Sequence, residues 1–139
     1  MRVPILDRLE SLATGQVLIA DGATGTMLQD AGLPRGMPGE AWILERPEEI
    51  MALHQAYLDA GSQLILTSTF GASRARLKAA GLEAQATEIN QRAAELARQA
   101  AGPDVYVGGD IGPSGEMMPL AEGPPSNQAS TASQSAFWL

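Results

Sequence analysis

The sequence predicts an α/β fold in which parallel strands alternate with helices. Three short apolar runs are typical of buried strands: residues 17–20, 64–66 and 105–107. Segments with apolar residues at helical spacing precede the first run and separate each run from the next. Each run ends in a polar, glycine-containing loop. Strands joined through helices form right-handed crossovers and therefore lie parallel. In such folds the loops that follow the strands carry the chemistry.

Four helices are predicted from their apolar spacing and their end signals. They cover residues 5–13, 47–60, 73–80 and 83–101. Pro47 suits a first helical turn, where its missing N–H costs nothing, and Gly61 is placed to cap the end of that helix. The glycine- and proline-rich passage over residues 32–39 is predicted to be a loop.

Composition excludes several classes of function. The net charge is −7 and the basic residues are scattered, so no surface is expected to follow a nucleic-acid backbone. The chain has no cysteine, which rules out disulfides and thiolate metal sites built from this chain alone. Its first residues do not resemble a signal peptide, and no run approaches the roughly 20 apolar residues of a membrane span. We therefore expect a cytoplasmic protein without membrane contact.

The loop after the first predicted strand has the sequence DGATGT over residues 21–26. Its glycines would let backbone N–H groups come close to a ligand carboxylate or phosphate. A tight turn in which Asp21 caps the backbone explains the same residues equally well. Ligand binding and turn formation both stay open for this loop.

The loops after the other two strands are also polar. Residues 67–72, TSTFGA, place three hydroxyls in a row, and residues 108–115 read GGDIGPSG. The latter contain neither a G-x-G-x-x-G pattern nor a P-loop lysine, so a dinucleotide site has little support. Capping of the next helix and reversal of the chain account for these residues as well as ligand contact does.

No residue is assigned a catalytic or metal-binding role. His54, the only histidine, falls in the middle of a predicted helix, away from the strand ends, which favours a packing or surface role. Trp42 could either pack the first long loop down or line a ligand pocket. Asp110 and Glu116 are close in sequence, but a loop does not fix them as an acid–base pair.

Three stretches in register resemble the homocysteine S-methyltransferase family, which includes the N-terminal domain of cobalamin-dependent methionine synthase and betaine–homocysteine methyltransferase. They are residues 19–28, 47–72 and 109–116, with Glu40-Ala41-Trp42 between the first two. The resemblance covers about residues 15–123. It implies an α/β fold that is the N-terminal portion, about three βα units, of a (β/α)8 TIM barrel with its site at the carboxyl ends of the strands.

The resemblance also implies a chemistry. In the family a zinc ion holds the sulfur of homocysteine as a thiolate, which takes a methyl group and gives methionine. By the match, Asp21, Gly22 and Thr67 bind the amino acid end of homocysteine, with Thr69 a weaker candidate. Gly71 stands where betaine-dependent members have an aromatic residue, which argues against betaine as the methyl donor.

This chain lacks the cysteine ligands that would hold zinc in such a site. The family holds zinc (Zn2+) with three cysteines, so we expect zinc only in the intact protein, and cobalamin only through another domain or protein. Residues 1–123 are predicted to be the N-terminal part of the homocysteine-binding domain, and residues 124–139 a disordered or foreign tail. A complete barrel needs about 250 residues. The 139-residue chain alone is therefore expected to be inactive.

Two other functions fit the residues. A non-catalytic α/β half-barrel would act as an interaction module, and its open sheet would need self-association or a partner. A different (β/α)8 enzyme, such as an aldolase, would need a lysine at a strand end. Lys78 lies on a predicted helix instead.

Overall fold

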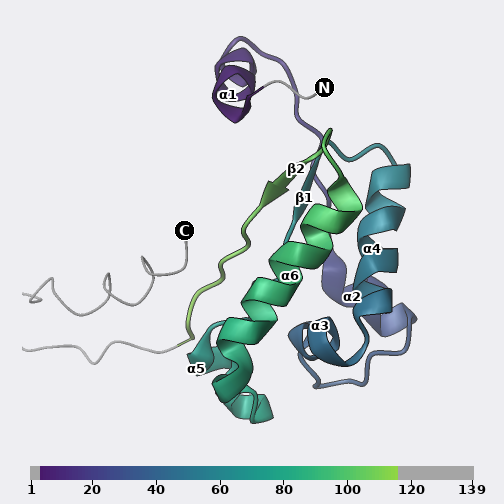
Figure 1. The fold of residues 1–139 in the computed structure, drawn as a ribbon, viewed down its shortest axis with the longest axis vertical. Helices are drawn as coiled ribbons and strands as arrows, with labels where there is room; N and C mark the ends of the chain where they lie inside the picture. The colour runs from purple at the N-terminus through teal and green to yellow at the C-terminus, as the bar shows by residue number, and fades with distance from the viewer. Residues whose placement is uncertain (1–3, 116–139) are drawn as a thin grey trace, which may run out of the picture.

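The computed structural model describes residues 4–115, and Figure 1 shows their arrangement. The helices and strands are α1 (Ile5–Ala13), α2 (Thr24–Asp30), α3 (Trp42–Glu45), α4 (Pro47–Asp59), β1 (Leu64–Leu66), α5 (Arg74–Leu77), α6 (Ala86–Ala101) and β2 (Tyr106–Gly108). Three 3-10 turns join them: η1 (Gly39–Ala41), η2 (Lys78–Ala80) and η3 (Glu83–Gln85). The fold is mixed α/β, as predicted. The predicted boundary after residue 123 and the tail over 124–139 lie outside the described residues.

Within residues 4–115, the sheet consists of two strands and one further backbone segment. β1 and β2 pair in parallel along their whole length. Ala20 forms an isolated parallel bridge with Leu64, and the Asp21 N–H donates to the Leu64 carbonyl at 3.0 Å. The predicted parallel arrangement is confirmed.

The first predicted strand, residues 17–20, is reduced to that single bridge. Val17 and Ile19 are 76% and 54% exposed, so the prediction of a buried strand was wrong. In the register set by Ala20 and Leu64, residues 17–19 would pair with residues 61–63. Gly61 lies in the turn after α4 and residues 62–63 are not in a strand, so the ladder does not continue there. The Gln63 N–H still donates to the Ile19 carbonyl at 2.7 Å. The sequence of an apolar run does not show how long the neighbouring strand is, and that length decides how many residues of the run can pair.

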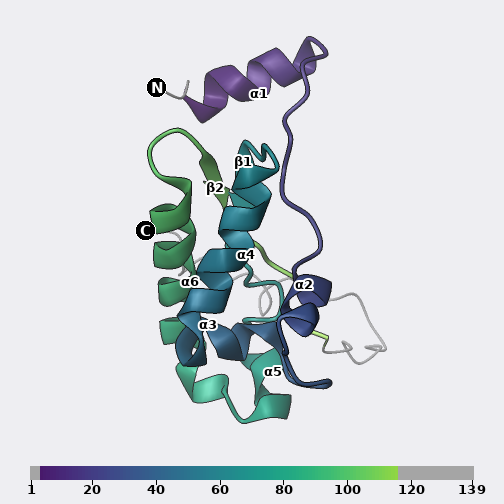
Figure 2. The same ribbon diagram turned by 90° about the vertical axis from the view of Figure 1, so that its right-hand side faces the viewer.

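The core lies between the long helices and the sheet. α6 packs against both strands and α4 packs against α6 and β1, as Figures 1 and 2 show. The largest fully buried apolar side chains come from α3, α4, β1, α5 and α6: Ile43, Ile50, Ile65, Leu77, Ile89 and Leu96. Ala97 and Ala101 of α6 let that helix approach Ile65 of β1 closely. Burial of one such large side chain contributes about 1.5–3 kcal/mol.

Most helix ends follow the sequence signals. Pro47 begins α4, Ser73 caps α5 by accepting from the Arg76 N–H, and Gly81 ends the following turn with φ +71°. The last long helix begins at Ala86, three residues later than predicted, because residues 83–85 form a 3-10 turn. The short helices α2 and α3 were not predicted, since segments of seven and four residues show too little periodicity.

α1 forms as predicted but has no buried residue. It lies at one end of the molecule, apart from the other helices in both views (Figures 1 and 2). The Arg8 guanidinium connects it to the sheet by donating to the Gln63 side chain at 3.2 Å. Within residues 4–115, none of the helices is both long and apolar enough to cross a membrane.

Candidate functional site

Three loops leave the sheet at the same end. They are residues 21–23 after the bridge, 67–72 after β1 and 109–115 after β2. The three segments run parallel, so their carboxyl ends lie together. α2, α3 and α5 gather at this end, opposite α1 (Figures 1 and 2). The candidate residues predicted from the sequence lie in these loops.

Asp21 of the first loop binds the end of β1. Its Oδ2 accepts a hydrogen bond from the Leu66 N–H at 2.9 Å. Its Oδ1 is buried and has no hydrogen-bond partner within the described part of the chain. A buried carboxylate oxygen without a partner is costly. Asp21 therefore combines the backbone-capping role considered from the sequence with one buried acceptor that no described residue satisfies.

Gly22 lies beside a tyrosine of α4. A Cβ on Gly22 would lie 3.4 Å from the Tyr57 hydroxyl oxygen. That hydroxyl donates to the Ala23 carbonyl at 2.8 Å and fixes the first loop against the helix. The Cβ contact itself would be an ordinary van der Waals distance, so the packing of Tyr57 does not by itself require glycine at position 22. The contact between Tyr57 and the first loop was not predicted from the sequence.

Thr67 and Thr69 form a closed hydrogen-bond ring with the backbone of Asp110. The Asp110 N–H donates to Thr67 Oγ1 at 3.0 Å, and Thr69 Oγ1 donates to the Asp110 carbonyl at 2.7 Å. The two Oγ1 atoms are 2.7 Å apart. Because the single hydroxyl proton of Thr69 goes to the carbonyl, the Thr67 hydroxyl donates to Thr69. Each oxygen keeps one lone pair, so the ring can accept from a ligand but cannot donate to one.

Ser68, between the two threonines, has a strained backbone. Its φ is +58°, in the left-handed region that serine rarely adopts. Its Oγ is buried without a hydrogen-bond partner among the described residues. Strain of this kind costs about 1–3 kcal/mol and persists where neighbouring contacts over-determine the chain. Here the hydrogen bonds of Thr67 and Thr69 hold the loop on both sides of Ser68.

Glu40 and Gly112 hold the loop over residues 67–72 from two sides. Glu40 is buried, and its Oε1 accepts from the Gly71 N–H at 2.5 Å. The Gly112 N–H donates to the Phe70 carbonyl at 3.1 Å. No role was predicted for Glu40, since glutamate is seldom buried and nothing in its neighbours in sequence signals burial.

The carboxylates of Asp21, Glu40 and Asp110 are close enough to interact. Partial burial raises the pKa of Asp110, and the charges of Asp21 and Glu40 raise it further. Like charges favour the protonated form of a carboxyl group, and a cation nearby would relieve their repulsion. The electrostatics at this end of the sheet therefore favour a positively charged ligand.

His54 and Trp42 belong to the core. His54 is fully buried on α4, and neither ring nitrogen has a hydrogen-bond partner within residues 4–115. Its burial agrees with the expected packing role and not with a surface role. Burial lowers the pKa of His54, and the charge of Asp21 acts in the opposite direction. Trp42 is 3% exposed in the core and packs the first long loop down, with Arg46 4.6 Å above its ring.

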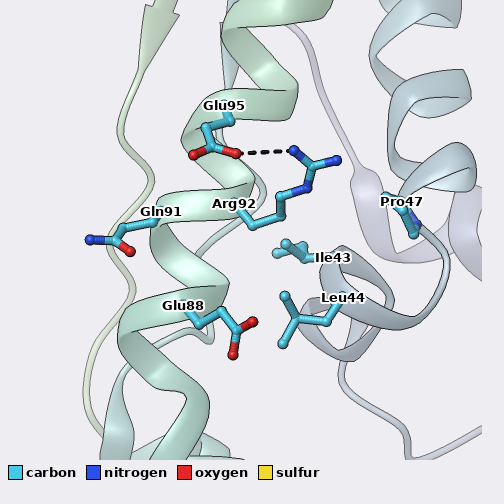
Figure 3. A pocket seen from close by; sticks show the side chains of 7 residues that line it. All are labelled: Ile43, Leu44, Pro47, Glu88, Gln91, Arg92 and Glu95. Atoms are coloured by element: carbon cyan, nitrogen blue, oxygen red, sulfur yellow. Dashed lines mark hydrogen bonds and ion pairs between the residues drawn. The ribbon is translucent and has the colours of Figure 1, made fainter.

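A surface groove lies away from the three loops. Figure 3 shows it between α3 and α6, with the Arg92–Glu95 ion pair of 3.0 Å on α6 at one side. It is lined by Ile43, Leu44, Pro47, Glu88, Gln91, Arg92 and Glu95. No residue of the three loops contributes to it. Within residues 4–115, no group of three histidine, cysteine, aspartate or glutamate side chains is arranged to hold a metal ion.

Comparison with known proteins gives one consistent family. Residues 18–138 match the family model for homocysteine S-methyltransferase. Methionine synthase of Mycobacterium leprae (strain TN) is 36% identical over 126 residues, which cover 82% of this chain and 10% of that protein. S-methylmethionine–homocysteine S-methyltransferase BHMT2 of Pongo abelii is 36% identical over 109 residues, covering 77% of this chain and 28% of that protein.

Solved structures agree with the sequence matches. The metallated form of homocysteine methyltransferase MmuM from Escherichia coli superposes with a TM-score of 0.63 at 31% identity, and its oxidised form with 0.65 at 33%. The two alignments cover 76% and 77% of this chain and 41% of MmuM. This chain thus spans less than half the length of each relative. The family match covers most of this chain, which therefore belongs to the homocysteine S-methyltransferase family.

Proposed function

We propose that this chain carries the homocysteine-binding loops of a homocysteine S-methyltransferase. The intact protein would transfer a methyl group to the sulfur of homocysteine and give methionine. The described residues would form the N-terminal portion, about three βα units, of a (β/α)8 barrel. Family membership and the likeness to MmuM support the reaction class and the fold.

The unpartnered Oδ1 of Asp21 carries the proposal for this chain. Leu66, whose N–H binds the other oxygen of Asp21, directly precedes Thr67 and its hydroxyl ring. Asp21 and the ring oxygens offer acceptors only, next to further negative charge from Asp110. An amino acid ammonium group has three N–H donors and one positive charge, which complements such a surface. We assign the ammonium to Asp21, Thr67 and Thr69, and the carboxylate to the exposed backbone at Gly22.

Zinc does not fit the residues of this chain. When bound, the metal supplies a thiolate at neutral pH, where a free thiol of pKa about 8.5 is mostly protonated. The chain has no cysteine, and its one histidine is buried in the core. No step is therefore assigned to zinc here, and cobalamin would belong to another domain or protein. The 139-residue chain is proposed to bind homocysteine without catalysing methyl transfer.

Binding of L-homocysteine to the purified chain tests the proposal. Amide chemical shifts over residues 21–23, 67–72 and 109–115 should move on titration. 4-Sulfanylbutanoic acid, which lacks the amino group, should bind much more weakly. Similar binding of the two compounds would contradict the assignment of the ammonium group.

A matched pair of variants locates the site. Asp21→Asn keeps an acceptor for the Leu66 N–H but removes the charge. A hydrogen bond to a charged group contributes about 1.5–3 kcal/mol, so the affinity for homocysteine should fall roughly 10- to 100-fold. Asp59→Asn, at the exposed end of α4, should have no effect. Equal affinities of the two variants would refute the role of Asp21.

A further inference from the structure

We propose that Glu40 is a positioning residue of the homocysteine site, which fixes the loop over residues 67–72 through Gly71. The inference rests on the proposed function of the same loops. It extends that function to a residue outside the three loops, in the η1 turn between α2 and α3.

The Glu40 carboxylate is held rigidly against Gly71. The residues that follow it, Trp42 and Ile43, are buried in the core and anchor the η1 turn. Glu40 itself is 9% exposed. Its Oε1 accepts from the Gly71 N–H at 2.5 Å, and an ionised acceptor makes such a hydrogen bond stronger than a neutral one.

Gly71 and Glu40 are also coupled sterically. A Cβ on Gly71 would lie 2.7 Å from Glu40 Oε1 and 3.1 Å from its carboxyl carbon. Both separations are shorter than ordinary van der Waals contacts. The backbone of Gly71 does not have a positive φ, so an alanine would be acceptable there if Glu40 were absent. Glycine at position 71 is therefore required by the carboxylate of Glu40.

The contact reaches the proposed ligand acceptors within two residues. The Phe70 carbonyl accepts from the Gly112 N–H, and Thr69 donates to the Asp110 carbonyl. A shift of Gly71 would move Thr69 and open the hydroxyl ring. The charge of Glu40 also acts on the carboxyl group of Asp110. Glu40 thus sets both the geometry and the charge of the acceptor surface without lying in one of the three loops.

Packing alone does not account for a carboxylate at this place. A buried charge is costly, and a glutamine or an apolar side chain would fill similar space with a smaller desolvation penalty. The negative charge strengthens the bond to Gly71 and adds to the field that attracts an ammonium group. Both effects serve a site for a cation.

A double-mutant cycle between the two positions tests the inference in the full chain. Gly71→Ala and Glu40→Ala should each weaken the binding of L-homocysteine by tenfold or more. In the double variant the new methyl group at position 71 occupies the vacated space, so the combined loss should be smaller than the product of the single losses. Glu83→Ala is the matched control, because Glu83 is an exposed glutamate outside the three loops, and it should bind homocysteine normally. Independent, multiplicative losses would overturn the coupling.

Two readouts separate positioning from simple packing. Hydrogen exchange of the Gly71 amide should accelerate in Glu40→Ala and stay slow in Glu40→Gln, whose amide oxygen can still accept. The pKa of Asp110, followed by the carboxyl 13C shift, should fall in both variants because Glu40 raises it. An unchanged Gly71 exchange rate in Glu40→Ala would overturn the proposal. If that variant does not fold, Glu40→Asp, which withdraws the carboxylate from Gly71, gives the same comparison.

These readouts do not depend on homocysteine. A wild-type chain that fails to bind L-homocysteine would refute the proposed function of the loops. The Gly71 exchange rate and the Asp110 titration would still confirm or overturn the contact between Glu40 and the loop.

Discussion

Thr69→Val should destabilise the chain by about 2–4 kcal/mol, although the two side chains have nearly the same shape. The change removes the 2.7 Å hydrogen bond from Thr69 to the Asp110 carbonyl and leaves the Thr67 hydroxyl proton without an acceptor. Thr67 and Thr69 are only 6% and 7% exposed, so water replaces partners lost within the ring poorly. One lost hydrogen bond costs about 1 kcal/mol, and one buried group left unpaired about 1–3 kcal/mol.

The ring also predicts how two substitutions combine. Thr67→Val leaves the Asp110 N–H without its acceptor and should cost a similar amount. The bond between the two threonines is lost in each single variant but only once in the double variant. The double variant should therefore lose about 1 kcal/mol less than the sum of the single variants.

Urea unfolding followed by circular dichroism at neutral pH measures these changes. Thr69→Ser keeps the hydroxyl and loses only a methyl group, so it should stay within about 1 kcal/mol of the wild type. A Thr69→Val variant within about 0.5 kcal/mol of the wild type would show that the hydroxyl is not buried in a ring. Strict additivity of the two valine substitutions would refute the bond between the threonines.

Three further predictions concern the same region. Because burial lowers the pKa of His54 below its ordinary 6.5, the unfolded chain takes up a proton more readily than the folded chain. The free energy of unfolding should therefore fall as the pH drops below that value, by at most about 1.4 kcal/mol per pH unit, and His54→Leu should remove this part of the slope. The raised pKa of Asp110 makes stability depend on pH in the opposite direction. Ionised Asp110 lowers the free energy of unfolding at neutral pH, and this loss is recovered as the pH falls through the raised pKa. Asp110→Asn should thus raise the urea midpoint at pH 7 while sparing the ring, which uses only the Asp110 backbone; a lower midpoint would contradict this. Gly112→Ala would place a Cβ 2.4 Å from the Phe70 carbonyl oxygen and should cost more than about 2 kcal/mol, measured against Gly25→Ala as a near-neutral control.

The loop candidates were found from the sequence because their positions after strands are a local signal. Asp21 and the threonines follow apolar runs, and parallel strands bring such loops to one edge. Their individual partners were not predictable. The partner of Thr69 is the backbone of Asp110, 41 residues away, and a backbone partner leaves no mark in the identity of the residue.

Glu40 and His54 show why other parts of the site were missed. A glutamate in a loop usually points to water, and the sequence alone does not show whether a lone histidine on a helix points to the core or to solvent. Glu40 became a buried acceptor because the core holds the residues that follow it, and because Gly71, 31 residues away, leaves room for its carboxylate. Both conditions depend on segments that are distant in sequence.

The sequence by itself determined the alternation of helices and strands, the parallel pairing and most helix ends, because periodicity and capping act over a few residues. The sequence also indicated the family, because three motifs in the family's order and spacing are specific to it. The tertiary structure decided the extent of the first strand, the direction of the hydroxyl ring and the contact of Glu40 with Gly71. Each of these depends on which distant segment lies alongside, and that is set by packing of the whole core.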